Sequence, residues 1–118
     1  MDEHSVADRQ RITEALNALH VELTEMISNL AGAAETVELD QGQQGRLSRI
    51  DAMQSQKMAE AHIRRARVRR ERVENILAQA DEPDFGCCGD CGDLIPIPRL
   101  MARPDAVLCV ECSDARRG

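Results

Sequence analysis

The feature that most constrains this chain is a cysteine spacing that occurs twice near its C-terminal end. Two residues separate Cys88 from Cys91, two separate Cys109 from Cys112, and 17 residues lie between the pairs. Two residues between thiols allow a tight turn to direct both sulfur atoms at one ion, and two such turns supply tetrahedral coordination. The spacing therefore predicts a small domain organised around one structural Zn²⁺, with Cys88, Cys91, Cys109 and Cys112 as its ligands.

The fifth cysteine, Cys87, leaves three residues before Cys91, and we interpret it as a spare thiol. It is either a small apolar filler beside the metal or a redox-sensitive group. The alternative for the whole cluster is a disulfide or a pair of redox dithiols. No export signal is recognisable, so we expect a reducing, cytoplasmic compartment, which favours zinc.

Four thiolates close the coordination sphere of zinc, whereas a catalytic zinc keeps one position for water. The sequence also offers no nucleophile and base at a useful spacing, no glycine loop that could cradle a phosphate, and no pair of carboxylates with a cavity. We therefore expect that the protein is not an enzyme.

The first third of the chain has the spacing of a long helix. Its apolar residues alternate at intervals of four and three: Ile12, Leu16, Leu19, Leu23, Met26, Leu30, Ala33 and Val37. This heptad pattern is typical of a coiled coil. The hydroxyl of Ser5 can accept a hydrogen bond from the backbone three residues on, so we expect the helix to begin there and to run to about Glu38.

A second helical stretch follows a connection, residues 40–46, that contains two glycines. Its apolar stripe is thinner and consists of Leu47, Ile50, Met58, Ala61, Val68 and Ile76. Pro83 should end this helix, because proline lacks the amide hydrogen that a helix interior needs. A short connection between helices of similar length predicts an antiparallel hairpin.

Composition agrees with a thin fold, because Phe85 is the only aromatic residue and cannot supply a thick core. We expect a mainly α protein in which residues 1–82 form a long antiparallel coiled-coil hairpin with its loop at about 40–46. Residues 83–118 then form a small C4 zinc-finger domain. A globular helix bundle and an intermolecular coiled coil are the alternatives; the short loop favours a monomer. No apolar stretch is long enough to predict a membrane span.

Charge is distributed unevenly along the chain, whose net charge is -6. The acidic excess lies in residues 1–60, whereas six arginines gather just after them: Arg64, Arg65, Arg67, Arg69, Arg70 and Arg72. These arginines raise the alternative of a zinc-ribbon module that binds nucleic acid or another protein. They surround the helix instead of forming one stripe and no aromatic residue stands ready to stack on bases, so we expect no sequence-specific DNA binding.

The C-terminal segment resembles a known signature, that of the DksA/TraR C4-type zinc-finger family. The resemblance rests on Asp84-Phe85-Gly86, Cys88-x2-Cys91-Gly92, Ile95, Arg99-Leu100, Ala102-Arg103-Pro104, Ala106 and Leu108-Cys109-x2-Cys112. The stretch between the cysteine pairs is more specific than the pairs themselves. A hairpin of two long helices in front of the finger is similar to the layout of that family.

The resemblance implies a bacterial transcription regulator that binds RNA polymerase, enters its secondary channel with the coiled coil, and modulates initiation together with guanosine tetraphosphate. Asp40 and Asp51 are then the acidic residues of the polymerase-facing tip, although the Asp-x-x-Asp-x-Ala tip of active members aligns with Gly45, Ser48 and Ile50. Arg72 and Arg103 match two cations of the alarmone pocket in that family, and Ser113 replaces the third, a lysine.

Overall fold

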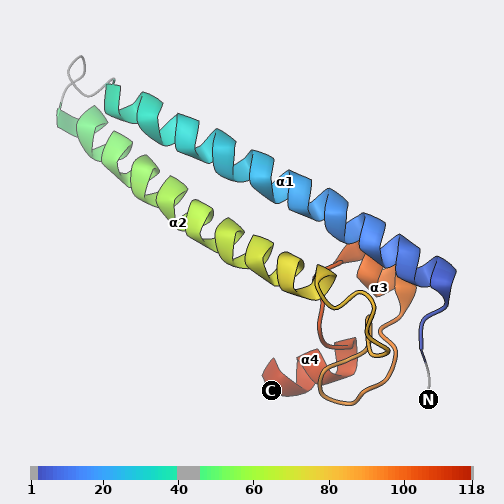
Figure 1. The fold of residues 1–118 in the computed structure, drawn as a ribbon. Helices are drawn as coiled ribbons and strands as arrows, with labels where there is room; N and C mark the ends of the chain where they lie inside the picture. The colour runs from blue at the N-terminus through green and yellow to red at the C-terminus, as the bar shows by residue number, and fades with distance from the viewer. Residues whose placement is uncertain (1–2, 40–45, 118) are drawn as a thin grey trace. The chain divides into compact units, whose positions relative to one another are not determined.

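The computed structural model describes residues 3–39 and 46–117, and within them the chain is helical (Figure 1). The four helices are α1 (Val6–Leu39), α2 (Arg46–Leu77), α3 (Ile97–Ala102) and α4 (Val110–Arg117). The only strand-like pairing in this part of the chain is one isolated antiparallel bridge between Cys87 and Leu94. The prediction of a mainly α fold is confirmed. None of the described helices is both long and apolar enough to cross a membrane.

The chain divides into two compact units. The finger unit contains Met1–His20 and Arg72–Gly118, and the hairpin unit contains Val21–Glu71. The finger unit thus holds the beginning of α1 and the end of α2 together with the cysteine-rich segment. The predicted domain boundary between residues 82 and 83 stays a prediction.

In the hairpin unit, parts of α1 and α2 lie side by side and run in opposite directions (Figure 1). Among the side chains of this unit whose burial the structure describes, four apolar ones are buried: Leu23, Ile27, Ala59 and Ala66. Near one end of this contact Arg70 Nη1 donates a hydrogen bond to Thr24 Oγ1 at 3.4 Å. Large side chains on α1 therefore face small ones on α2.

The expected apolar stripes need two corrections in this unit. On α1 the residue buried after Leu23 is Ile27, which is 8% exposed, and not Met26, which is 46% exposed. A straight α-helix drifts relative to a strict heptad, so an interval of four keeps the side chain on the contact face. On α2 three expected stripe residues, Ile50, Met58 and Val68, are exposed.

The finger unit has its own small core. The buried apolar side chains in it are Ile12, Leu16 and Leu19 from α1, Val73 from α2, and Phe85, Cys88, Ile95 and Leu100 from the segment after α2. The start of α1 is as expected, since the amide of Asp8 donates to Ser5 Oγ at 3.1 Å and the helix begins at the next residue, Val6.

The expected end of the second helix at Pro83 is wrong, because α2 ends at Leu77. From Gln79 to Glu82 the backbone forms tight turns, with amides bonded to carbonyls three residues earlier. Arg9 occupies the carbonyls that these turns expose: its guanidinium donates to Ala80 O at 3.1 Å, Glu82 O at 2.9 Å and Pro83 O at 3.2 Å. A proline also disfavours helical geometry in the residue before it, so Pro83 keeps the helix from resuming at Glu82.

Candidate metal centre and arginine pocket

The first cysteine pair lies in a tight turn closed by backbone hydrogen bonds. The amide of Gly92 donates to Cys88 O at 3.0 Å, and the amide of Cys88 donates to Asp93 O at 2.8 Å. Gly92 has a φ of 78°, in the left-handed region that a residue without a Cβ adopts readily. The turn therefore needs a glycine directly after Cys91.

The second pair is built at the beginning of α4. Cys109 directly precedes the helix, and the amide of Cys112 donates to Cys109 Sγ at 3.4 Å. Arg116, one turn further along α4, forms a bidentate ion pair with Asp90 of the first turn, with N–O distances of 2.8 and 2.6 Å. The arginine lowers the pKa of Asp90 by hydrogen bonding, which favours the charged pair. The two cysteine turns are thereby tied together.

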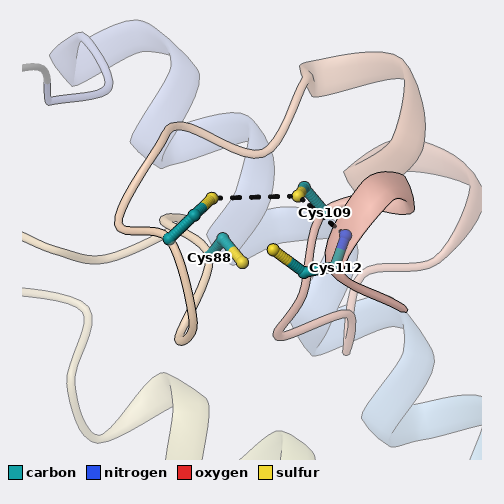
Figure 2. A group of neighbouring side chains, drawn as sticks. Cys88, Cys109 and Cys112 are labelled. Atoms are coloured by element: carbon teal, nitrogen blue, oxygen red, sulfur yellow. Dashed lines mark hydrogen bonds between the residues drawn. The ribbon is translucent and has the colours of Figure 1, made fainter. Parts of the chain in front are cut away.

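The four predicted ligand thiols meet at one point. The sulfur atoms of Cys88, Cys91, Cys109 and Cys112 all lie within 4.8 Å of one another, and those of Cys91 and Cys109 are 3.9 Å apart. Figure 2 shows the side chains of Cys88, Cys109 and Cys112 directed toward a common centre. Bonds of about 2.3 Å to a tetrahedral zinc ion would place sulfurs about 3.8 Å apart, so the donor set fits that ion.

The thiols of the cluster have strongly unequal acidities. Hydrogen bonds from the backbone amides of Cys91 and Cys109 lower the pKa of Cys88 to about 6, although burial opposes them. The pKa of Cys112 is raised, first by its hydrogen bond with Cys109 and then by that with Cys88. In Cys91 the amide of Asp93 favours the thiolate, but the Cys88 side chain and burial outweigh it and raise the pKa. Without a cation the low pKa of Cys88 favours its thiolate and the raised pKa values of Cys91 and Cys112 disfavour theirs. A bound cation would stabilise the thiolate forms.

The fifth cysteine, Cys87, is not part of this group of four. It is half-buried, and it forms the isolated backbone bridge with Leu94. The role of Cys87 as the spare thiol stays a prediction.

A second site in the finger unit is a cavity of about 270 Å³, which we call the arginine pocket. Its charged and hydroxyl side chains come from Arg72, Arg99, Arg103, Asp105, Ser113 and Arg117. Arg72 and Arg103, which the family resemblance suggested, thus line one pocket. Their binding role stays a prediction. Sequence reasoning did not propose Arg99, Asp105 or Arg117 as pocket residues, because only the fold brings α2, α3 and α4 together.

The structure describes only one of the two residues expected at the acidic tip. Asp51 is exposed on α2, whereas Asp40 lies outside the described residues. In the arginine-rich part of α2, Arg64, Arg65 and Arg67 are exposed, and Arg65 interacts with His62 at 2.7 Å.

Comparison with known proteins defines the class of the C-terminal segment. Residues 83–116 match the family described as "Prokaryotic dksA/traR C4-type zinc finger". This segment is therefore a C4 zinc finger of the dksA/traR type, and the resemblance seen in the sequence is confirmed.

Its curated relatives carry the name "RNA polymerase-binding transcription factor DksA". The protein of Haemophilus influenzae is 49% identical over 41 residues, which are 35% of this chain and 28% of that protein. The Escherichia coli protein is 46% identical over 41 residues, 35% of this chain and 27% of the relative. The match thus spans less than a third of either relative.

A solved structure agrees over a longer stretch. Transcription factor DksA2 from Pseudomonas aeruginosa superposes with a TM-score of 0.80 at 19% identity, covering 96% of this chain and 85% of that chain. At 19% identity, this structural similarity establishes that the two chains share a fold.

Proposed function

We propose that this protein is a transcription regulator that binds RNA polymerase and modulates initiation. The observation that carries the proposal is a stretch of 41 residues that is close to half identical to RNA polymerase-binding factors, in a chain whose residues 83–116 match the zinc-finger family. The fold shared with a second transcription factor of this kind over nearly the whole chain supports it.

In this proposal the helical hairpin enters the secondary channel of the polymerase. Two antiparallel helices are narrow enough for a channel that would exclude a globular domain. Asp51, together with Asp40, would supply negative charge near a catalytic centre that contains magnesium and basic side chains. The exposure of Asp51 is compatible with this role.

The finger would hold one structural zinc ion through Cys88, Cys91, Cys109 and Cys112. Support comes from the convergence of the four sulfur atoms and from the family of the segment. Zinc in this site would supply folding energy and no chemistry, because four thiolates leave no open coordination position. A role as a non-enzymatic, cytoplasmic regulator is consistent with such a site.

The arginine pocket would bind guanosine tetraphosphate as an effector, with Arg72 and Arg103 among its lining residues. Guanidinium groups bind phosphate in a planar, bidentate geometry, which suits a ligand with several phosphate groups.

The proposal is tested by retention of purified core RNA polymerase on the immobilised, zinc-loaded protein. We expect retention that another secondary-channel factor abolishes by competition. Failure to retain polymerase, or retention that the competitor leaves unchanged, would contradict the proposal. Transcription in vitro from a ribosomal promoter, with wild type, Asp40→Asn and Asp51→Asn, then reports whether the tip is active.

A nucleic-acid-binding role is the second candidate, favoured by the exposed Arg64, Arg65 and Arg67 on α2. Binding through phosphates falls steeply with salt concentration, whereas binding to polymerase requires no DNA. Titration of a random-sequence duplex at two salt concentrations therefore separates the two functions.

A further inference from the structure

Hydrogen bonds join the two cysteine-bearing turns on both sides of the second cysteine pair. The amide of Gly89, in the first turn, donates to Val107 O at 2.8 Å. The guanidinium of Arg116 donates to both carboxylate oxygens of Asp90, from Nη2 at 2.6 Å and from Nε at 2.8 Å. Val107 precedes the second pair in the sequence and Arg116 follows it. The contact of Arg116 is therefore the one that fixes α4, the helix that carries Cys112.

The helix α4 has few other means of attachment. It consists of eight residues, and none of them is buried. Most helices are held in place by an apolar face that packs against the core, and a helix this short is not stable alone in water. The position of α4 therefore depends on polar contacts and on the metal ligand that it carries.

The pair between Arg116 and Asp90 has the geometry of a strong surface contact. Many exposed ion pairs contribute little to stability, but a bidentate guanidinium–carboxylate pair is an exception. The side chain of Asp90 is 33% exposed, and that of Arg116 is 66% exposed. The backbone of Asp90 is already fixed, since its amide donates to Cys88 Sγ at 3.4 Å. Arg116 thus binds a carboxylate that lies between Cys88 and Cys91.

We infer that the Arg116–Asp90 pair is a clamp that keeps α4 on the first cysteine turn and thereby slows the release of zinc. The inference rests on the proposed zinc centre. Each turn supplies two of the four thiols, so zinc leaves only after one cysteine pair has dissociated from it. While the clamp is closed, the dissociated cysteine pair stays close to the ion and rebinds, because binding within one molecule has a high effective concentration. Opening of the clamp allows the turns to separate and completes the release.

The charge of Arg116 could act on the same site in a different way, and the two effects can be separated. Arg116 lies four residues after Cys112, so their side chains are neighbours on α4. Four thiolates around one Zn²⁺ carry a net charge of about -2, which a nearby cation stabilises. The clamp requires the contact between two side chains, whereas charge compensation requires the arginine alone.

The test is the transfer of zinc from the zinc-loaded, full-length protein to an excess of a chromogenic chelator, followed by absorbance. We expect Arg116→Gln and Asp90→Asn each to release zinc roughly fivefold faster than wild type. The double variant should be no faster than either single variant, because both substitutions remove the same contact. Arg11→Gln removes the same charge from an exposed position on α1 and should leave the rate unchanged.

Asp90→Asn is the deciding variant. If charge were the whole effect, loss of a carboxylate beside the thiolates would slow the release of zinc, whereas loss of the clamp makes release faster. Slower or unchanged release from a variant that holds one zinc per chain would overturn the inference. Arg116→Lys decides if Asp90→Asn fails to fold. It keeps the charge without the bidentate geometry, so release should be faster than in wild type, and an unchanged rate would overturn the inference equally.

The clamp also predicts how the rates depend on salt. Raising the salt concentration from about 0.01 M to about 1 M shortens the Debye length from about 30 Å to about 3 Å, which weakens an exposed ion pair. We expect the difference in rate between wild type and Arg116→Gln to fall below about twofold at the higher concentration. A difference that stays the same at both concentrations would contradict a clamp made by an ion pair.

Zinc content separates failure of the inference from failure of the proposed zinc centre. Wild-type protein that keeps no zinc after dialysis would contradict the zinc centre, and the inference with it. One zinc per chain in wild type, together with equal release rates in wild type, Arg116→Gln and Asp90→Asn, would contradict only the inference.

Discussion

At the scale of single residues, Gly86 is the position at which a substitution meets two obstacles at once. Its φ is 80°, and an added Cβ would lie 2.5 Å from His4 Cδ2. His4 is buried there, and its Nε2 is 3.0 Å from Gly86 O. The contact with the imidazole can be relieved only if His4 moves, and the strain of the positive φ remains even then.

We therefore expect Gly86→Ala to lower the free energy of unfolding by roughly 2–4 kcal/mol, the sum of positive-φ strain and overpacking. The matched control is Gly92→Ala. Gly92 has a φ of 78° but no atom within 4 Å of the added Cβ, so its cost should be the strain alone, about 1–2 kcal/mol. Thermal denaturation of the zinc-loaded variants measures both. Equal losses would show that contact with His4 contributes nothing.

The assignment of the spare thiol predicts a difference in metal content between single cysteine variants. Cys91→Ser removes one of four convergent sulfurs, and we expect most of the zinc to be lost on dialysis. Cys87→Ser should keep one zinc per chain, as measured by mass spectrometry of the metal. Loss of zinc from Cys87→Ser with retention in Cys88→Ser would instead make Cys88 the spare residue.

The spacing of the cysteines in the sequence predicted which four thiols lie together in the structure. This was possible because a metal site requires its ligands in short, local spacings. Residue types and their spacing did not predict the arginine pocket as a whole. No sequence pattern marks Asp105 and Arg117. They line the pocket because folding brings side chains from α2, α3 and α4 together.

At the scale of elements, the end of α2 depends on a side chain from α1. Arg9 donates to three carbonyls of the turn, those of Ala80, Glu82 and Pro83, at distances of 2.9–3.2 Å, and its side chain is 20% exposed. The planar guanidinium of Arg9 donates from two nitrogens to acceptors that lie apart, whereas the three donors of an ammonium group share one atom.

We accordingly expect Arg9→Lys to lower the free energy of unfolding by about 1–3 kcal/mol, because at least one hydrogen bond to a charged donor is lost. Arg11→Lys is the control, since Arg11 is exposed on the same helix and should change stability by less than about 0.5 kcal/mol. Chemical denaturation at constant zinc compares the two. Similar midpoints for both variants would mean that Arg9 does not stabilise the turn.

Helix positions were predictable from sequence to different degrees. The first helix has large apolar residues, so its pattern identified Leu23 correctly, but it selected Met26 where Ile27 is the buried residue. On α2 the expected stripe included Met58 and Val68, which are exposed, whereas Ala59 and Ala66 are buried. Alanine carries too little hydrophobicity to reveal a contact face by pattern alone.

At the scale of the whole molecule, the two compact units should respond differently to metal removal. Structural zinc contributes on the order of 10 kcal/mol to small domains, and the finger unit contains the cysteine cluster. The hairpin unit contains none of these cysteines, so its buried contact does not depend directly on the metal.

We expect a strong chelator to abolish amide protection at Ile95 and Leu100 in hydrogen-exchange measurements, while Leu23 and Ile27 keep most of theirs. Restoring zinc should return protection to the finger unit. Equal loss of protection in both units would show that the hairpin unit cannot persist without the metal.

The contact between large residues of α1 and alanines of α2 also has a consequence for how this protein can diverge. Truncation of Leu23 or Ile27 leaves a void, whereas enlargement of Ala59 or Ala66 forces the helices apart. The two helices therefore tolerate opposite kinds of mutation. In homologous sequences we expect the α1 positions to be occupied by other bulky side chains and the α2 positions by only the smallest residues. A change of side-chain volume on one helix should then be accompanied by a compensating change on the other.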